Sequence, residues 1–221
     1  MKPGSFVGPA VLAALFVLAV PAAGQGLDIG AEAGINVSDL SVDAAGSDET
    51  ETSTGLRVGG VLRLDLGPMF GLQTGVYYSE KGATDPGDPD VDTNLELTYV
   101  EAPLLVTLEI PTGPSPVSPR FYAGPQVAFE SGCDISVVGD GSSVSLSCDE
   151  ARQQGDFEID TRSADFSVVV GGGIDLAAGP GAFTVDARYD LGLSDINDFD
   201  GGAELTNRNL AFSAGYLISL P

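Results

Sequence analysis

The chain has 221 residues, enough for one domain or at most two. Its 32 acidic and nine basic residues give a formal charge of −23, the wrong sign for a protein that binds free nucleic acid. The sequence contains no His, which excludes Ser-His-Asp and Cys-His catalysis, His metal ligands and a His pH switch. A hydrophobic content of 43% is too high for a disordered acidic chain, so we expect a folded protein with an acidic exterior.

The first 24 residues have the composition of an export signal. Lys2 supplies a positive charge, residues 11–20 are continuously apolar, and residues 21–24 are mostly small. The apolar run is too short to cross a membrane comfortably as a helix. We predict a signal peptide over residues 1–24, cleavage between Gly24 and Gln25, and one β-barrel domain over residues 25–221. No Cys follows the cleavage region, so a lipoprotein anchor is not predicted.

The rest of the chain alternates apolar residues with Gly, polar or charged residues at a period of two, as half-buried strands do. Eight such segments occur, at residues 27–38, 56–66, 70–79, 98–110, 120–130, 165–176, 183–192 and 209–220. Most are long enough to cross a bilayer when tilted, and closed bacterial barrels have an even strand number. The pattern predicts an all-β, eight-stranded antiparallel up-and-down transmembrane β-barrel. Pro103 removes a hydrogen-bond donor from the fourth segment, so we expect a bulge or local bend there.

The connections between these segments alternate in length, as in outer-membrane barrels. The connections at residues 67–69 and 178–180 are short, and the connection at residues 110–119 is of moderate length and rich in Pro. The long connections are residues 39–53, 82–94, 131–162 and 194–208, and they hold 20 of the 32 acidic residues. We therefore predict acidic loops on the extracellular side and both chain ends on the other side.

Charged residues gather on the face of the strands opposite the apolar face. An eight-stranded barrel is just wide enough for side chains to fill its interior. We predict a plugged lumen, rather than an open pore, in which the following charges pair across the interior: Arg57, Arg63, Asp65, Glu101, Glu109, Arg120, Asp175, Asp186, Arg188 and Asp190. The alternative is partial solvation of these charges without a network. The inward Gly residues would leave room for the long Arg and Tyr side chains opposite them.

The two cysteines, Cys133 and Cys148, both lie in the longest predicted connection. Two cysteines in an exported chain indicate one disulfide that closes one loop. Two unrelated free thiols are the alternative.

Several segments resemble the PorT-type outer-membrane β-barrel family of Bacteroidetes-like bacteria. The resemblance rests on residues 30–38, 72–82, 97–105 (with its Tyr99-x-Glu101-x-Pro103 segment), 122–125, 171–175 and 188–193. These segments occur in the order and at the spacing found in that family, and the resemblance extends over residues 27–220. The resemblance implies an eight-stranded barrel in the outer membrane, in a family whose named members are linked to protein secretion and surface assembly.

We find no pattern that predicts a cofactor, a metal site or catalysis. The acidic segment 88–92 lacks the Gly and Glu of an EF-hand. We interpret it and segment 195–201 as solvated acidic loops, with binding of a divalent cation as the alternative. Gly171, Gly172 and Gly173 are not followed by a helix or a P-loop Lys, so they do not indicate a phosphate site. No Gly-x-Ser-x-Gly motif is present.

Together these features predict a non-enzymatic, multi-pass barrel of the bacterial outer membrane with a structural role or a role in a surface or secretion complex. Its expected surroundings are outer-membrane lipid and a surface or secretion-system protein, with no nucleic-acid partner. Two alternatives stay open. A soluble, secreted lipocalin-like barrel would bind an apolar ligand and turn its apolar face inward, and a small pore would conduct ions.

Overall fold

The computed structural model describes residues 26–42, 51–85, 91–139, 142–148, 164–193 and 205–220. They form a closed antiparallel β-barrel of eight strands, with a ninth, short strand added outside the barrel. The predicted signal peptide and its cleavage position lie outside the described residues. The described part of the chain contains no helix with the length and apolarity needed to cross a membrane.

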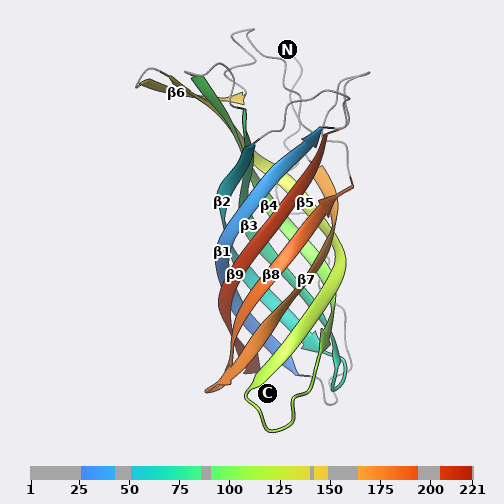
Figure 1. Ribbon diagram of the computed structural model, residues 1–221. Coiled ribbons are helices and arrows are strands. Elements are labelled where there is room, and N and C mark those ends of the chain that lie inside the picture. Colours follow the sequence, from blue (N-terminus) through green and yellow to red (C-terminus); the bar gives the residue numbers. More distant parts are fainter. Residues whose placement is uncertain are drawn as a thin grey trace, which may run out of the picture.

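Each barrel strand pairs with its neighbours along the chain, and the last strand pairs with the first (Figure 1). The strands are Leu27–Val42 (β1), Glu51–Asp65 (β2), Phe70–Asp85 (β3), Val91–Glu109 (β4), Val117–Gly139 (β5), Ser142–Ser147 (β6), Ala164–Ala178 (β7), Gly181–Gly192 (β8) and Leu205–Leu220 (β9). Closure runs from the pair Leu27 and Leu220 to the pair Val42 and Leu205. Because β4 also pairs with β5, and β5 with β7, the eight barrel strands leave no open edge in the wall.

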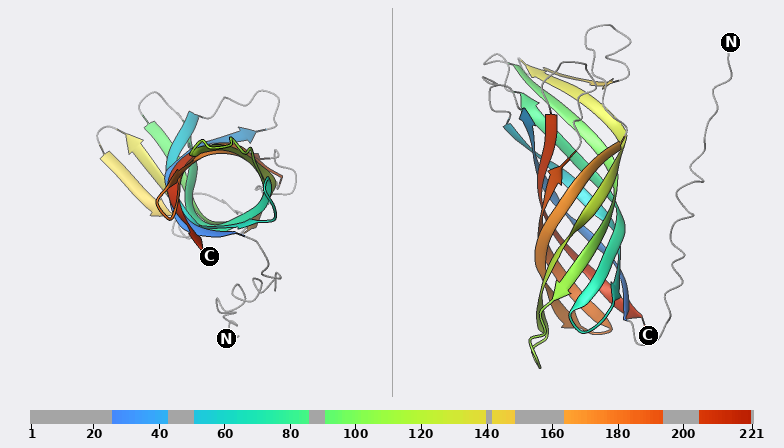
Figure 2. Two further views of the ribbon diagram at one scale, coloured as in Figure 1. Left: turned by 90° about the horizontal axis from the view of Figure 1, so that it is seen from below. Right: turned by 90° about the vertical axis from the view of Figure 1, so that its right-hand side faces the viewer.

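The short connections lie together at one end of the barrel, as predicted. They join β2 to β3, β4 to β5 and β7 to β8, and the start of β1 and the end of β9 lie at the same end (Figures 1 and 2). Two of these turns contain a glycine with positive φ, Gly113 at 68° and Gly179 at 63°. Glycine adopts this conformation without the steric cost that a side chain would add.

The faces of the wall are segregated as the alternation predicts. Large apolar side chains point outward and stay exposed, among them Val185 at 62%, Val76 at 59% and Phe166 at 57%. Charged and polar side chains point inward and are buried, among them Glu101 at 0% and Arg120 at 1% exposure. This is the reverse of a lipocalin, whose apolar face lines the interior. A wall of this kind is suited to hydrocarbon outside, where only closed barrels and helices satisfy every backbone group.

Most outward-facing aromatic residues form two belts, and Phe212 on β9 lies between them. The belt nearer the short turns contains Phe70, Phe121, Phe183 and Tyr216, and the farther belt contains Tyr78, Phe129, Phe166 and Tyr189. On β3 and on β5 the two belt residues are eight positions apart. Eight residues span about 26 Å along a strand, or about 20 Å along the axis of a barrel whose strands tilt by about 40°. The belts therefore bracket an apolar band close to the thickness of a bacterial outer membrane.

The prediction of a long loop over residues 131–162 is wrong for its first half. β5 continues to Gly139, and β6 turns back along it from Ser142 to Ser147. The reason is local, because apolar residues alternate with polar ones on both arms of this hairpin and favour strand pairing. β3 and β4 likewise extend toward each other as far as the pair Asp85 and Thr93.

Of the bulge or local bend predicted at Pro103, the bulge is not present. The β4–β5 register is the same on both sides of Pro103, and its shift lies instead at Thr98 and Tyr99. Toward β3 the described pairing is interrupted between Leu104 and Glu101 but resumes in the same register. The carbonyl of Pro103 accepts a hydrogen bond of 2.8 Å from the Thr74 hydroxyl. A missing donor is thus accommodated by a gap in the ladder rather than by an extra residue.

Arginine on the outward face tests the assignment of the apolar band to lipid. Val185 lies on β8 between Phe183 and Tyr189, and we expect Val185→Arg to lower the free energy of unfolding by about 2–4 kcal/mol. Leu66→Arg, at the turn end, serves as the control and should cost about 1 kcal/mol or less. Urea unfolding in lipid vesicles measures both, and equal losses would contradict the assignment.

Candidate functional site: the charged interior of the barrel

The candidate site is the polar interior, which all eight barrel strands line. Among the described residues, 11 charged side chains are buried: Glu32, Arg57, Arg63, Lys81, Glu101, Arg120, Asp165, Asp175, Asp186, Arg188 and Asp190. A buried charge is costly unless an opposite charge and hydrogen bonds compensate it. The arrangement of these side chains decides whether the interior is neutralised or available to a solute.

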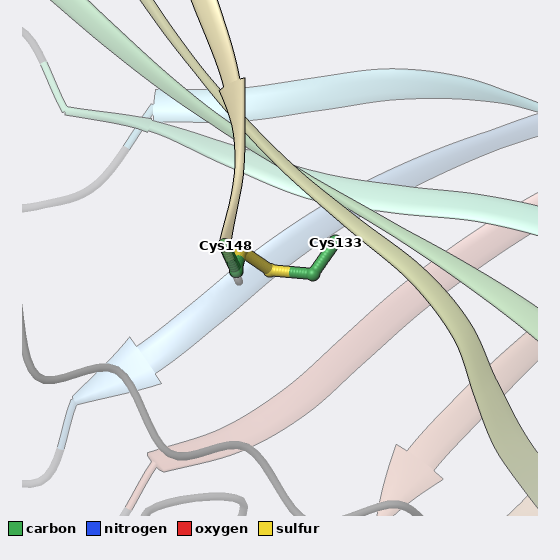
Figure 3. The surroundings of a disulfide bond; sticks show 2 residues. All are labelled: Cys133 and Cys148. Carbon is green, nitrogen blue, oxygen red and sulfur yellow. A yellow bond between two sulfur atoms is a disulfide. The ribbon is translucent and has the colours of Figure 1, made fainter. Parts of the chain in front are cut away.

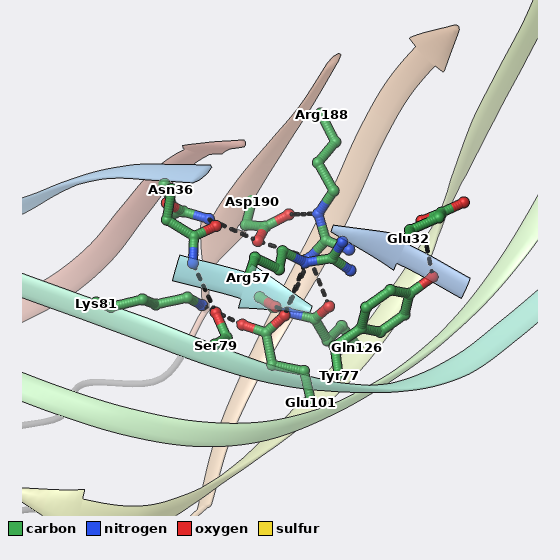
Figure 4. A network of polar contacts seen from close by, with 12 residues as sticks. Glu32, Asn36, Arg57, Tyr77, Ser79, Lys81, Glu101, Gln126, Arg188 and Asp190 are labelled. Carbon is green, nitrogen blue, oxygen red and sulfur yellow. Dashed lines mark hydrogen bonds and ion pairs between the residues drawn. The ribbon is translucent and has the colours of Figure 1, made fainter. Parts of the chain in front are cut away.

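Glu101 is the centre of the first cluster (Figure 4). Lys81 Nζ lies 2.7 Å from its Oε1, while Arg188 Nη2 and Arg57 Nε lie 3.5 Å and 3.6 Å from its Oε2. The carboxylate is fully buried, and the side chains of the three cations are at most 5% exposed. One anion thus bridges β2, β3, β4 and β8 across the barrel.

Arg188 continues this cluster toward the opposite wall. Its guanidinium donates to both carboxylate oxygens of Asp190, at 2.8 Å and 2.7 Å, and to Gln126 Oε1 at 2.6 Å. Asn209 Nδ2 donates to Asp190 Oδ2 at 3.1 Å and to Asn36 Oδ1 at 3.2 Å. Asn36 in turn donates to the Ser79 hydroxyl at 2.8 Å. The chain of contacts returns to β3 and encircles the interior (Figure 4).

Asp175 is the centre of the second cluster, nearer the short turns. Arg63 Nη1 lies 2.7 Å and Arg120 Nε 3.2 Å from Asp175 Oδ2. Arg120 Nη2 also contacts Asp186 Oδ1 at 2.8 Å, and Thr184 donates to the other oxygen of Asp186 at 2.6 Å. The side chain of Arg120 has no exposed surface, so its charge is held entirely by these partners.

Two tyrosine rings in the interior pack directly against glycine residues of the wall. A Cβ atom at Gly59 or Gly75 would lie 2.4 Å or 2.8 Å from the ring of Tyr77, and one at Gly171 would lie 2.5 Å from the ring of Tyr122. The guanidinium of Arg57 covers the Tyr77 ring at 3.6 Å from its centroid, a favourable cation–π distance. The absent side chains of these glycines make the space that the rings occupy.

Apolar side chains fill interior space between the polar groups. Three described clusters are Val61, Tyr77 and Leu217; Leu97, Tyr99 and Ala128; and Leu105, Tyr122 and Val169. All of these residues are at most 6% exposed. The described interior is therefore packed along its length by side chains of both kinds.

The predicted network residues fall into two groups. Eight lie within the two clusters: Arg57, Arg63, Glu101, Arg120, Asp175, Asp186, Arg188 and Asp190. Asp65 and Glu109 face inward but end their strands beside the short turns, where they are half-buried. Among the described residues neither has an ion-pair partner. Glu109 is opposite Arg120 in the β4–β5 register, but the Arg120 guanidinium contacts Asp175 and Asp186 instead.

Sequence reasoning missed three buried charges. Lys81 continues the inward series of β3 two residues beyond Ser79, where the predicted strand ended. Glu32 lies on the polar face predicted for the first strand, and it accepts a hydrogen bond of 3.1 Å from the Tyr77 hydroxyl. Asp165 begins the inward series of β7. Extending the period-two pattern past the predicted strand ends would have found Lys81.

Cys133 and Cys148 form the predicted disulfide (Figure 3). Their Cα atoms are 5.5 Å apart, and they occupy the position next to the paired residues Asp134 and Ser147 at the base of the β5–β6 hairpin. A 15-residue loop closed in this way gains about 3 kcal/mol from the lower entropy of the unfolded chain. The bridge therefore stabilises the hairpin outside the barrel rather than the barrel wall.

Within the part of the chain that the structure describes, no group of three or more His, Cys, Asp or Glu residues is arranged to hold a metal ion. The acidic segment 195–201 and most of segment 88–92 lie outside the described residues. Their interpretation as solvated loops stays a prediction.

Neutralising Glu101 tests the importance of the first cluster. Glu101→Gln leaves buried cations without their shared anion, so we expect a loss of about 3–5 kcal/mol in the free energy of unfolding. Glu109→Gln is the matched control at the mouth and should change stability by about 0.5 kcal/mol or less. Denaturant unfolding of both variants in the same vesicles gives the comparison, and a small effect of Glu101→Gln would show that the cluster is solvated.

Removing the disulfide separates hairpin stability from barrel stability. In the Cys133→Ser, Cys148→Ser double variant, we expect faster amide hydrogen exchange in β6 and in the outer part of β5, with unchanged exchange in β8. Hydrogen exchange followed by mass spectrometry reads both regions at once. Faster exchange throughout the barrel would contradict a local role for the bridge.

Comparison with known proteins agrees with this architecture. Among solved structures, the outer membrane protein OprG from Pseudomonas aeruginosa is similar with a TM-score of 0.55 and 13% identity, over 90% of this chain and 96% of OprG. Neisserial surface protein A is 16% identical over 89% of this chain and 99% of its own, with a TM-score of 0.47. The attachment invasion locus protein Ail of Yersinia pestis is 14% identical over 86% and 98%, with a TM-score of 0.42. The likeness to OprG shows a shared fold.

No curated protein sequence matches the chain. The sequence model of one family does match it, over residues 21–198, which include seven of the eight barrel strands. The apolar exterior and the closed ladder of strands agree with this family match. The chain belongs to the outer membrane protein beta-barrel domain family.

Proposed function

We propose that this outer-membrane barrel is a non-enzymatic scaffold that presents acidic extracellular segments and supports a surface or secretion complex. The observation that carries the proposal is the neutralised interior. Both charge clusters are buried, and their described cations have acidic partners. These side chains therefore stabilise the barrel wall, and they do not form a binding site or a channel for a solute.

The distribution of basic residues supports a role for the outer surface. Five of the nine basic residues are buried in the interior: Arg57, Arg63, Lys81, Arg120 and Arg188. Of the rest, Lys2 lies in the predicted signal peptide. The four connections predicted to be extracellular thus combine 20 acidic residues with three basic ones, Arg152, Arg162 and Arg208. A surface of this charge attracts cations and basic proteins.

The absence of an activated nucleophile supports a non-enzymatic role. The sequence has no His, and the dense ionisable clusters of the described interior are closed off by their own ion pairs. A link to protein secretion is what the PorT-type resemblance implies, and it belongs to this proposal.

A small pore is the second candidate, because eight-stranded barrels enclose a polar lumen. The packed tyrosine, leucine and arginine side chains of the interior favour the closed alternative. A soluble lipocalin-like binder is not favoured, because its apolar face would point inward.

Conductance and surface cleavage together test the proposal. In planar bilayers we expect the purified barrel to show no steady conductance, and on intact cells we expect protease cuts only between β1 and β2, β3 and β4, β5 and β7, and β8 and β9. A steady conductance that changes in Glu101→Gln would establish a pore instead. Recovery of the mature protein from cells without detergent would overturn the membrane assignment itself.

A further inference from the structure

The β5–β6 hairpin forms an arm that leaves the barrel on the side opposite the short turns (Figure 1). β5 continues ten residues past Phe129 of the farther aromatic belt, about 33 Å along the strand. β4 follows it outward, from the pair Thr98 and Gly132 to the pair Val91 and Gly139. The arm is therefore a small sheet held well beyond the apolar band.

β6 is the outer edge of this sheet. Among the strands that the structure describes, it pairs with β5 alone, from Ser142 with Gly139 to Ser147 with Asp134. An edge strand presents backbone donors and acceptors to other chains, and proteins normally block such an edge with Lys, Pro or a bulge. The sequence of β6, Ser-Ser-Val-Ser-Leu-Ser, contains none of these blocking residues.

The disulfide holds this edge in place. Cys148 follows β6 directly and is bonded to Cys133 on β5, so β6 is fixed to its neighbour at the end nearer the barrel. A strand that is ordered before binding loses less entropy when a partner strand is added.

The charges on the arm indicate the chemistry of the partner. Glu96 on β4 and Asp134 on β5 are directly opposite each other, and both are exposed. Like charges in this position destabilise a sheet. A strand added to β6 would be separated from Asp134 by Ser147, so only a long cationic side chain, Lys or Arg, would reach toward the two carboxylates and reduce their repulsion. A second copy of the chain would bring the same two carboxylates to the interface, so pairing between copies is opposed.

We propose that the edge of β6 binds an extended, basic segment of a partner protein by β-strand addition, with Glu96 and Asp134 attracting its Lys or Arg side chains. Main-chain hydrogen bonds would supply the affinity and the carboxylates the preference for a basic sequence. The inference deepens the proposed function, because it places the docking surface of the scaffold on one strand.

A synthetic peptide of alternating Lys and Val residues is the probe, and the purified full-length barrel in nanodiscs is the receptor. Two further peptides carry N-methyl groups on alternate residues, in one phase or the other, which keeps the charge but removes one row of main-chain donors. We expect fluorescence anisotropy to show binding of the parent peptide and at least tenfold weaker binding of one methylated peptide. Equal binding of all three would reduce the interaction to charge attraction and overturn the proposal.

Three variants locate the binding surface. Glu96→Gln with Asp134→Asn should weaken binding at least fivefold, while Asp28→Asn, at the opposite end of the barrel, should leave it unchanged. The Cys133→Ser, Cys148→Ser variant should also bind more weakly, while its barrel strands remain protected from exchange. Equal weakening by Asp28→Asn would overturn the assignment to the arm, as would a dimer of the peptide-free barrel in sedimentation. Conductance is unaffected by any of these results, so failure here leaves the closed scaffold standing.

Discussion

The structure depends on one constraint, that a chain in hydrocarbon must satisfy every backbone donor and acceptor within itself. Closure of β1 on β9 meets it, because no barrel strand keeps an unpaired edge at the depth of the apolar band. Closure also fixes two faces, since side chains of a strand alternate between outside and inside. The apolar exterior and the charged interior are thus two results of the same hydrogen-bonded ladder.

The charged interior must also be stabilised, because charges buried between eight strands are costly unless opposite charges or hydrogen bonds compensate them. Glu101 and Asp175 provide this compensation, because each pairs with more than one cation. Buried ion pairs contribute little net stability compared with apolar packing, but they penalise any register that separates them. A shift of one residue between two strands would move Arg120 or Arg188 to the lipid side. The clusters therefore act as a check on strand register.

The strand number and the sidedness could be predicted from sequence because a period of two is a local signal. Ile29, Ala31 and Ala33 define their face without knowledge of any partner strand. The positions of strand ends could not be predicted in the same way, as Lys81 and the β5–β6 hairpin show. They depend on which neighbour continues alongside, and that is a property of pairing. Likewise, Asp65 and Glu109 share the correct face, but their height in the barrel follows from strand stagger, which no single strand encodes.

The pairing of Leu27 with Leu220 has a consequence for how the molecule is made. The two strands of this seam are the first and the last of the barrel, so pairing them has the greatest loop-closure entropy cost of any ladder in the wall. Until the seam forms, the backbone amides and carbonyls along one edge of β1 and one edge of β9 have no hydrogen-bond partners. An open sheet of this kind is unstable in the bilayer. Assembly is therefore cooperative, because β1 becomes stably inserted only when β9, the last strand of the chain, pairs with it.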